Sequence, residues 1–281
     1  MDAPTFSAGG LTISPPTTDG ALMNVLLWGD SGSGKTTLAA TAPGRKLFVM
    51  LDPGGGLSLT AREDIDQLDL SAESSIKLMS QFRTVDPYSL TMFLRTHLDI
   101  ETVVLDSATA LAYAALQEAV TKAGGKSTME QPGMHGYTYR NGSILRVVTA
   151  IMRMCALERR HLIVITHEGN ADRNEDGVVL SVTMALSDSV ANQVGLRFNE
   201  VWHVSDTGKE RRIAVRPCRL RKPMKTRLFT ATEPEFVWHY DPDTQVGEGI
   251  TDWYRAWQVG GGKKLPMPIR VTTTSGGANK K

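Results

Sequence analysis

The chain has 281 residues, with 31 Lys and Arg against 30 Asp and Glu and a formal net charge of +1, so charge alone marks neither a nucleic-acid binder nor a membrane-surface protein. Its two cysteines, Cys155 and Cys218, are far apart and form no C-x-x-C pair, which favours reduced thiols and a cytoplasmic location. The first residues lack a basic start followed by an apolar run, and no apolar stretch is as long as a membrane span, so we expect neither a signal peptide nor a membrane partner.

Composition divides the chain into three parts. Residues 1–20 are rich in Thr, Ser, Pro and Gly, which predicts a flexible N-terminal arm. Residues 21–258 alternate short apolar runs with helix-forming stretches, and their length suits one substantial α/β core. Residues 259–281 are rich in Gly, Lys and Thr and are expected to form a flexible basic tail.

The most informative stretch matches the phosphate-binding pattern G-x-x-x-x-G-K-[ST] at residues 29–36. A predicted buried strand over 25–28 precedes it, and a predicted helix over 35–42 follows, which disfavours the alternative of a Gly/Ser-rich surface turn. In this pattern Lys35 contacts the β- and γ-phosphates, the Thr36 hydroxyl binds Mg²⁺, and backbone N–H groups surround the anion. The expected nucleotide-binding residues are Gly29, Asp30, Ser31, Gly32, Ser33, Gly34, Lys35, Thr36 and Thr37, with ATP and Mg²⁺ as ligands.

The segment after this loop is predicted to begin with a buried strand over 46–51, which ends in a turn of Asp52, Pro53 and three glycines. A short strand is predicted over 76–79. Asp86 followed by Pro87 is typical of a helix N-terminus, with Asp as N-cap and Pro at the first position.

A second informative stretch is the β-branched run 102–105, which ends in Asp106 about 70 residues after the phosphate loop. This layout is typical of a Walker-B element, in which the carboxylate at the end of the strand holds Mg²⁺ through water. The alternative is an aspartate that only caps the helix predicted over 108–122. The phosphate loop favours the Walker-B interpretation.

The middle of the chain contains two polar stretches around an apolar unit. Residues 124–142 are predicted to form a long loop, and loops of this length are usually functional or disordered. An amphipathic helix over 143–157 and a buried strand over 162–166 follow, with His167 at the strand end. Residues 168–187 form the second polar stretch.

The last part of the domain has strand-like runs and a cluster of basic residues. Between Lys209 and Arg227 there are nine basic residues and one acid, Glu210. Such a cluster forms either the solvated face of a hairpin or a phosphate-facing surface. An aromatic-rich helix or strand is expected over 240–257. The strand-like runs are 200–205, 212–215 and 226–229.

The segment TVVLDSATAL at residues 102–111 strongly resembles the Walker-B strand of RecA-type recombinases. The order of the parts over residues 23–229 is also similar to that family, and most similar to the compact phage RecA-like ATPases of the Sak-type single-strand annealing group. This resemblance implies an α/β RecA-like P-loop core over residues 21–258. In such a core a mostly parallel central sheet is flanked by helices, with C-terminal β-hairpins and disordered termini.

The resemblance also assigns roles by position. Lys35, Thr36 and Asp106 would hold phosphate and Mg²⁺, and His167 would be the polar sensor of the γ-phosphate. The polar stretches 124–142 and 168–187 would line a path for single-stranded DNA. Arg219 falls where the family supplies a positive residue to the ATP of the neighbouring subunit.

One departure from the family concerns hydrolysis. The family usually carries a water-activating glutamate two residues past the acidic end of its second strand, and this chain has Gly54 there. Asp52 or Glu168 could take its place, so turnover is expected to be slow. For His167, the alternative is an ordinary histidine at a strand end.

These inferences predict an ATPase of DNA recombination that acts on single-stranded DNA as a filament or ring, with a single-strand binding protein as a further partner. For a phage protein the location would be the bacterial host cytoplasm. Two alternatives remain open: a helicase-loader or packaging-type ATPase, and a nucleotide-gated interaction protein with little turnover. No Arg-rich lid segment follows the Walker-B strand and no N-K-x-D motif lies in the core, which disfavours a small-molecule kinase and a GTPase.

Overall fold

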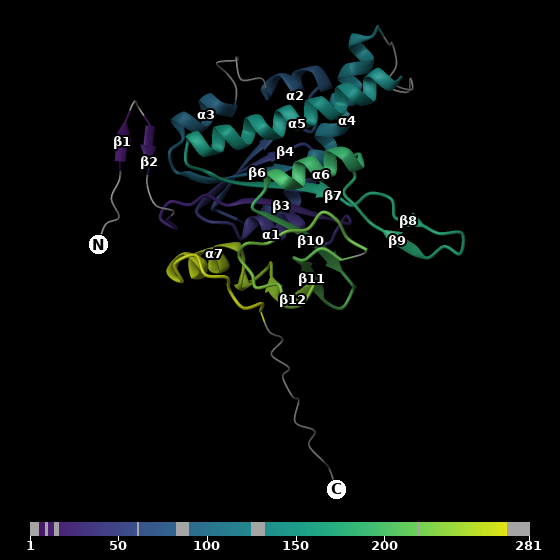
Figure 1. Cartoon of the computed structure of the whole chain (residues 1–281). Coiled ribbons are helices and arrows are strands. Elements are labelled where there is room, and N and C mark those ends of the chain that lie inside the picture. The colour runs from purple at the N-terminus through teal and green to yellow at the C-terminus, as the bar shows by residue number, and fades with distance from the viewer. Residues whose placement is uncertain are drawn as a thin grey trace.

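The computed structural model describes residues 6–8, 11–13, 17–60, 62–82, 90–124, 133–218 and 220–268. Its centre is an eight-stranded sheet with the strand order β12-β11-β10-β3-β7-β6-β4-β5 (Figure 1). The six strands from β10 to β5 are parallel to their neighbours, whereas β11 and β12 are antiparallel. The strands are β3 (Asn24–Gly29), β4 (Arg45–Met50), β5 (Ile65–Asp69), β6 (Ile100–Asp106), β7 (His161–His167), β10 (Glu200–Asp206), β11 (Arg211–Ala214) and β12 (Glu235–Trp238).

Helices cover both faces of this sheet, which confirms the predicted α/β class with a mostly parallel central sheet. One face carries α2 to α6, and the other carries α1 and α7 (Figure 1). The helices are α1 (Lys35–Ala40), the 3₁₀ turn η1 (Gly55–Leu59), α2 (Ser75–Gln81), α3 (Leu90–Thr96), α4 (Ala108–Lys122), α5 (Met134–Leu157), α6 (Asp188–Arg197) and α7 (Ile250–Val259). Within the described residues, none of them is long and apolar enough to cross a membrane.

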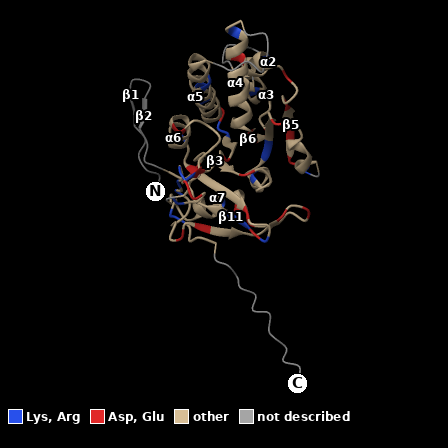
Figure 2. Cartoon of the chain, turned by 90° about the vertical axis from the view of Figure 1, so that its right-hand side faces the viewer, with Lys and Arg blue, Asp and Glu red and all other residues tan. Residues whose placement is uncertain are grey.

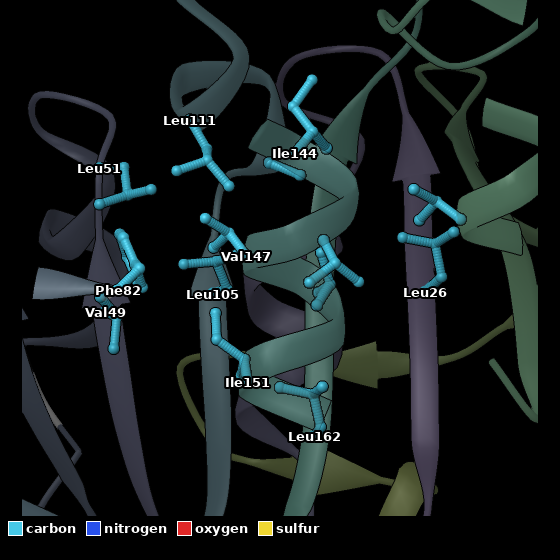
Figure 3. Packing of buried hydrophobic residues seen from close by; sticks show 14 of the residues in the cluster. Leu26, Val49, Leu51, Phe82, Leu105, Leu111, Ile144, Val147, Ile151 and Leu162 are labelled. Atoms are coloured by element: carbon cyan, nitrogen blue, oxygen red, sulfur yellow. The ribbon is translucent and has the colours of Figure 1, made fainter. Parts of the chain in front are cut away.

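The apolar core is split into two layers by the central sheet, because successive side chains of a strand point to opposite faces. On β3, Leu26 and Trp28 join the layer under α4, α5 and α6, while Val25 and Leu27 join the layer under α1 and α7. Figure 3 shows the first layer, where Ile144 and Val147 pack among residues of the strands and of α4. Since parallel strands are covered on both faces, they form continuous apolar runs such as those the sequence shows.

In the part of the chain that the structure describes, three small antiparallel hairpins lie outside the central sheet. They are β1 (Phe6–Ala8) with β2 (Leu11–Ile13), β8 (Asp172–Arg173) with β9 (Val179–Ser181), and β13 (Tyr240–Asp241) with β14 (Val246–Gly247). The first falls inside the predicted N-terminal arm. Of the predicted C-terminal tail, residues 260–268 follow α7, and Met267 is buried against the second core layer; residues 269–281 lie outside the described residues.

Several predictions of local structure are wrong. Residues 76–79 belong to helix α2, not to a strand, and its N-cap Ser74 accepts a hydrogen bond from the Lys77 backbone at 3.4 Å. Residues 226–229 form no strand; Phe229 makes only an isolated bridge to Leu265, and the neighbouring Lys225 makes one to Val201. Strands β5 and β12 and helix α6 were not predicted. The expected helix start at 86–87 lies outside the described residues.

Candidate active site

The candidate site lies at the carboxyl edge of the parallel sheet, where the ends of neighbouring strands meet. β3 ends at Gly29 and leads into the phosphate loop, and β6 ends at Asp106. β7 lies between these two strands and ends at His167. The strand order therefore brings together three of the predicted site residues that are far apart in the sequence.

The phosphate loop has the backbone of an anion-binding concavity. Gly32 has φ +76° and Gly34 has φ +95°, in the left-handed region that favours glycine. Gly34 precedes α1 and offers no side-chain cap, so the first N–H groups of this helix remain available. The hydroxyl of Ser33 is buried and has no hydrogen-bond partner among the described residues. The loop thus has the free donors that a phosphate group needs.

Lys35 is closed over this loop. Its Nζ donates hydrogen bonds to the carbonyl oxygens of Gly29, at 3.0 Å, and Asp30, at 2.6 Å. Burial lowers the pKa of Lys35, while the negative charges of Asp106, Asp30, Glu168 and Asp52 oppose that shift. One ammonium group therefore faces four carboxylates, so a further cation would be electrostatically favoured here.

Thr36 and Asp106 join the two predicted motifs. The Thr36 hydroxyl donates to Asp106 Oδ2 at 2.8 Å, although the two residues lie 70 positions apart. Asp106 is 5% exposed, and burial raises its pKa, opposed by the hydrogen bond from Thr36; the charge of Asp52 raises it further. A divalent cation beside this pair would relieve the burial of the charge.

The donor set fits Mg²⁺ bound together with a nucleotide. Among the described residues there is no group of three or more His, Cys, Asp or Glu side chains that could hold a metal ion alone. Mg²⁺ typically takes only one or two protein ligands and completes its shell with water and substrate phosphates. The Thr36 hydroxyl and the Asp106 carboxylate suit that arrangement.

Asp52 lies between Ser107 and His167 at the carboxyl edge of the sheet. It follows β4, and its Oδ2 accepts a hydrogen bond from the Ser107 hydroxyl and lies 3.5 Å from His167 Nε2. Burial opposes ionisation of Asp52, but the hydrogen bonds from His167 and Ser107 hold its pKa below the ordinary value. His167 is in turn fixed by its backbone N–H, which donates to Thr109 Oγ1 at 2.9 Å.

Glu168 points to the other side of the phosphate loop. Its Oε2 lies 2.6 Å from His203 Nε2 on β10, so the side chain reaches across β3 and away from Asp106. The backbone N–H of Glu168 donates to the Gly29 carbonyl at 2.8 Å. His203 was not predicted as a site residue, because its partner lies 35 positions away and no local pattern marks it. Gly54 is the N-cap of η1, and a Cβ placed on it would meet nothing within 4 Å.

The first predicted DNA loop differs from the expectation. Residues 134–142 are the first turns of α5, and residues 125–132 lie outside the described part of the chain. Tyr139 donates from its hydroxyl to Glu118 Oε2 at 2.8 Å on α4, so its ring packs between the two helices. Tyr137 is 45% exposed, with the Arg140 guanidinium 5.2 Å from its ring centre. Tyr139 is half-buried, so Tyr137 is the more accessible ring for stacking.

The second predicted DNA loop contains the β8–β9 hairpin. Arg173 on β8 is exposed, and its Nη1 donates to the Gly177 carbonyl at 2.8 Å. The segment is tied to the site, because the Ala185 N–H donates to the His167 carbonyl at 2.8 Å. In Figure 1 this hairpin projects from the right-hand side of the molecule, and the N-terminal end of α5 lies on the same side, above it.

The basic cluster 209–227 is partly neutralised by acids. Glu235 on β12 accepts from Arg212 at 2.7 Å and from Arg221 at 2.6 Å, and Glu210 also pairs with Arg212. Figure 2 shows acidic and basic segments side by side around β11. Arg219, the predicted trans-acting arginine, lies outside the described residues, so its role stays a prediction.

Comparison with known proteins identifies the family. A family model described as an AAA domain, of the P-loop NTPase class, matches residues 22–231. No curated protein matches the chain. Because the match spans most of the sequence, the chain belongs to the AAA-domain family.

Proposed function

We propose that this AAA-domain protein binds and hydrolyses ATP with Mg²⁺ and uses the cycle to act on single-stranded DNA as an oligomer, in a recombination reaction. The observation that carries the nucleotide part is the 2.8 Å hydrogen bond between Thr36 Oγ1 and Asp106 Oδ2. It joins the phosphate loop to the strand end at Asp106, which supports a shared Mg²⁺ site of the kind that phosphoryl transfer requires.

Different residues of this site have different roles in nucleotide binding. Lys35 exchanges its two carbonyl acceptors for phosphate oxygens, a stronger, charge-assisted contact. The buried Ser33 hydroxyl gains the partner that it lacks. Thr36 and Asp106 would hold Mg²⁺, which would supply positive charge to offset that of the phosphates. The fixed donors and charges need no rearrangement as negative charge develops.

Asp52 is the group proposed to accept the proton of the attacking water. Its Oδ2 is held by Ser107 and His167, which leaves Oδ1 for the water, and its lowered pKa keeps the carboxylate ionised at neutral pH. Glu168 is the weaker candidate, because His203 draws it towards β10. His167 acts as a positioning residue through its contact with Asp52.

The nucleotide site is connected to the proposed DNA-binding segment through the backbone. Glu168 donates to Gly29 at the start of the phosphate loop, and Ala185 donates to His167. Both ends of the segment 168–187 are therefore hydrogen-bonded to strand ends beside the proposed phosphate site. This supports a coupling in which ATP sets the position of the β8–β9 hairpin and of Arg173.

A second candidate function is a nucleotide-gated interaction protein with little turnover. The observation that favours it is Gly54, where the RecA-type family would place its glutamate and where this chain has only open space. Measurable ATP hydrolysis that depends on Asp52 would exclude this alternative.

The DNA part is tested with a fluorescein-labelled oligo-dT and fluorescence anisotropy, in Mg²⁺ and a non-hydrolysable ATP analogue. We expect salt-dependent binding that is tighter for the single strand than for a duplex of equal length. Tyr137→Ala should weaken binding by about 1–3 kcal/mol if a base stacks on the ring. Arg173→Gln should lower the slope of log affinity against log salt by about 0.7, the value for one contact to a single strand.

The matched control is Lys77→Gln, an exposed charge on α2 that pairs with Glu73. It should leave both the affinity for oligo-dT and the salt slope unchanged. Binding that ignores salt, or that favours the duplex, would contradict the DNA part while leaving the nucleotide part intact.

A further inference from the structure

A second cation lies against the phosphate loop. A Cβ placed on Gly34 would lie 3.2 Å from both Cδ and Nε of Arg211 and 3.6 Å from its Cζ. Gly34 is the residue directly before Lys35. The guanidinium of Arg211 is thus packed over the same turn of backbone that is proposed to hold the phosphates.

The sheet explains why Arg211 reaches this position. β10 runs parallel to β3, whose end leads into the phosphate loop, and β11 pairs with β10 on its other side. Arg211 is the first residue of β11, directly opposite Asp206, the last residue of β10. The hairpin therefore ends beside the loop and carries Arg211 to its rim. Arg212 points to the opposite face, as alternation along a strand requires.

Arg211 is weakly engaged compared with Arg212. Arg212 donates to Glu210 and Glu235 through hydrogen bonds of 2.8 and 2.7 Å. The guanidinium of Arg211 makes no hydrogen bond within the described part of the chain, and its ion pair with Asp206 has an N–O distance of 3.6 Å. A guanidinium has five N–H donors in a fork that matches a phosphate. Arg211 therefore has donors available beside the loop that is proposed to hold the phosphates.

We propose that Arg211 is a phosphate-binding group supplied by the same subunit, and that it exchanges Asp206 for the polyphosphate when the nucleotide binds. This inference rests on the proposed ATP site. A carboxylate 3.6 Å away holds the guanidinium at the rim only loosely, and a triphosphate offers more charge and a two-pronged contact. Arg211 and Lys35 then both act on the phosphates.

The proposal predicts how neighbouring substitutions behave. Arg211→Gln removes the contact and should weaken binding of a fluorescent ATP analogue, with Mg²⁺, by on the order of ten- to a hundredfold. Lys209→Gln removes one positive charge from the exposed tip of the same hairpin and should change the affinity less than twofold. Asp206→Asn removes the competing charge but keeps an acceptor for the Gly208 N–H, which now donates at 2.7 Å. It should bind the analogue more tightly than the wild type.

A second competitor shows which part of the nucleotide is contacted. Inorganic tripolyphosphate displaces the analogue from the wild type, and Arg211→Gln should weaken that displacement as well. The thermal midpoint of each variant, measured without nucleotide, verifies the fold. The proposal is overturned if Arg211→Gln and Lys209→Gln bind the analogue with equal affinity, or if Asp206→Asn binds it more weakly than the wild type. It is also overturned if tripolyphosphate displaces the analogue equally well from the wild type and from Arg211→Gln.

The Lys35→Ala variant separates this failure from failure of the ATP site. If Lys35→Ala loses binding and Arg211→Gln does not, only the role of Arg211 is wrong. If Lys35→Ala also binds the analogue like the wild type, the proposed ATP site itself is wrong.

Discussion

Lowering the pH should destabilise the fold through one histidine at the base of the sheet. His161 begins β7, its Nδ1 accepts a hydrogen bond from the Met23 N–H at 3.0 Å, and its ring packs edge-on against Tyr254 at 5.1 Å. Burial lowers the pKa of His161 from 6.5 to about 4. Protonation would place a charge in this site and a proton on the atom that accepts from Met23.

The sign follows from proton linkage. Between pH 6.5 and about 4 the unfolded chain binds a proton at this position and the folded chain does not, so stability falls as the pH falls. The contribution of His161 to the free energy of unfolding is complete above pH 6.5 and is lost by about pH 4. A pKa of about 4 against 6.5 corresponds to about 3 kcal/mol in the free energy of unfolding.

Urea unfolding of the wild type and His161→Gln, measured at several pH values from 7.5 to 4, provides the assay. Glutamine keeps an acceptor for the Met23 N–H and does not titrate. The free energy of unfolding of the wild type, relative to that of His161→Gln, should therefore fall by about 3 kcal/mol as the pH falls. The control, His239→Gln, removes an exposed histidine and should follow the wild type. If the difference in unfolding free energy between the wild type and His161→Gln does not change with pH, the reasoning is refuted.

Three further predictions concern the proposed catalytic groups and one thiol. Asp52→Asn should lower the ATPase rate by about 10²–10⁴-fold and Glu168→Gln by much less; equal rates for both and the parent would exclude a protein base. Arg219→Ala and Lys35→Ala subunits should each be nearly inactive but regain activity when mixed on oligonucleotide, and no recovery in co-assembled mixtures would exclude a trans-acting arginine. Burial raises the pKa of Cys155 to about 12, so a thiol reagent should modify only Cys218 until urea unfolds the chain. Rapid reaction of both thiols in the folded protein would contradict this burial.

The parts of the site predicted from sequence are those set by local chemistry. The phosphate loop needs glycines at fixed positions for its backbone, and a strand that ends in Asp106 needs only a β-branched run. The parallel order of the strands then brings both to one edge. The contact between Thr36 and Asp106 follows from that order, so it could be expected before the structure.

The remaining contacts depend on long-range pairing that the sequence does not display. The pair Glu168–His203 joins two strands on either side of β3. Glu235 neutralises Arg212 and Arg221 from a strand that lies 23 and 14 positions further along the chain. The sequence of the cluster 209–227 therefore suggests more unpaired positive charge than the fold contains.

Helix α5 shows how tertiary contacts override local composition. Gly136, Gly142 and the polar residues between them favour a loop, and glycine in a helix costs about 1 kcal/mol relative to alanine. The helix nevertheless begins at Met134, because Tyr139 hydrogen-bonds Glu118 on α4 and Ser143 is buried. Similarly, the short, mostly apolar segment 76–79 suits a strand or a helix equally, and its local helix signal is the N-cap Ser74.

The most direct test of the account is isothermal titration of ATP and Mg²⁺ into the wild type, Lys35→Ala and Lys77→Ala. The account predicts a saturable site in the wild type and in Lys77→Ala, whose lysine lies exposed on α2. It predicts a loss of at least about 1.5–3 kcal/mol in Lys35→Ala, because a charge-assisted phosphate contact is removed without disturbing the apolar core. Equal binding by all three proteins, or no binding by the wild type, would contradict the central claim that this loop holds a nucleoside triphosphate.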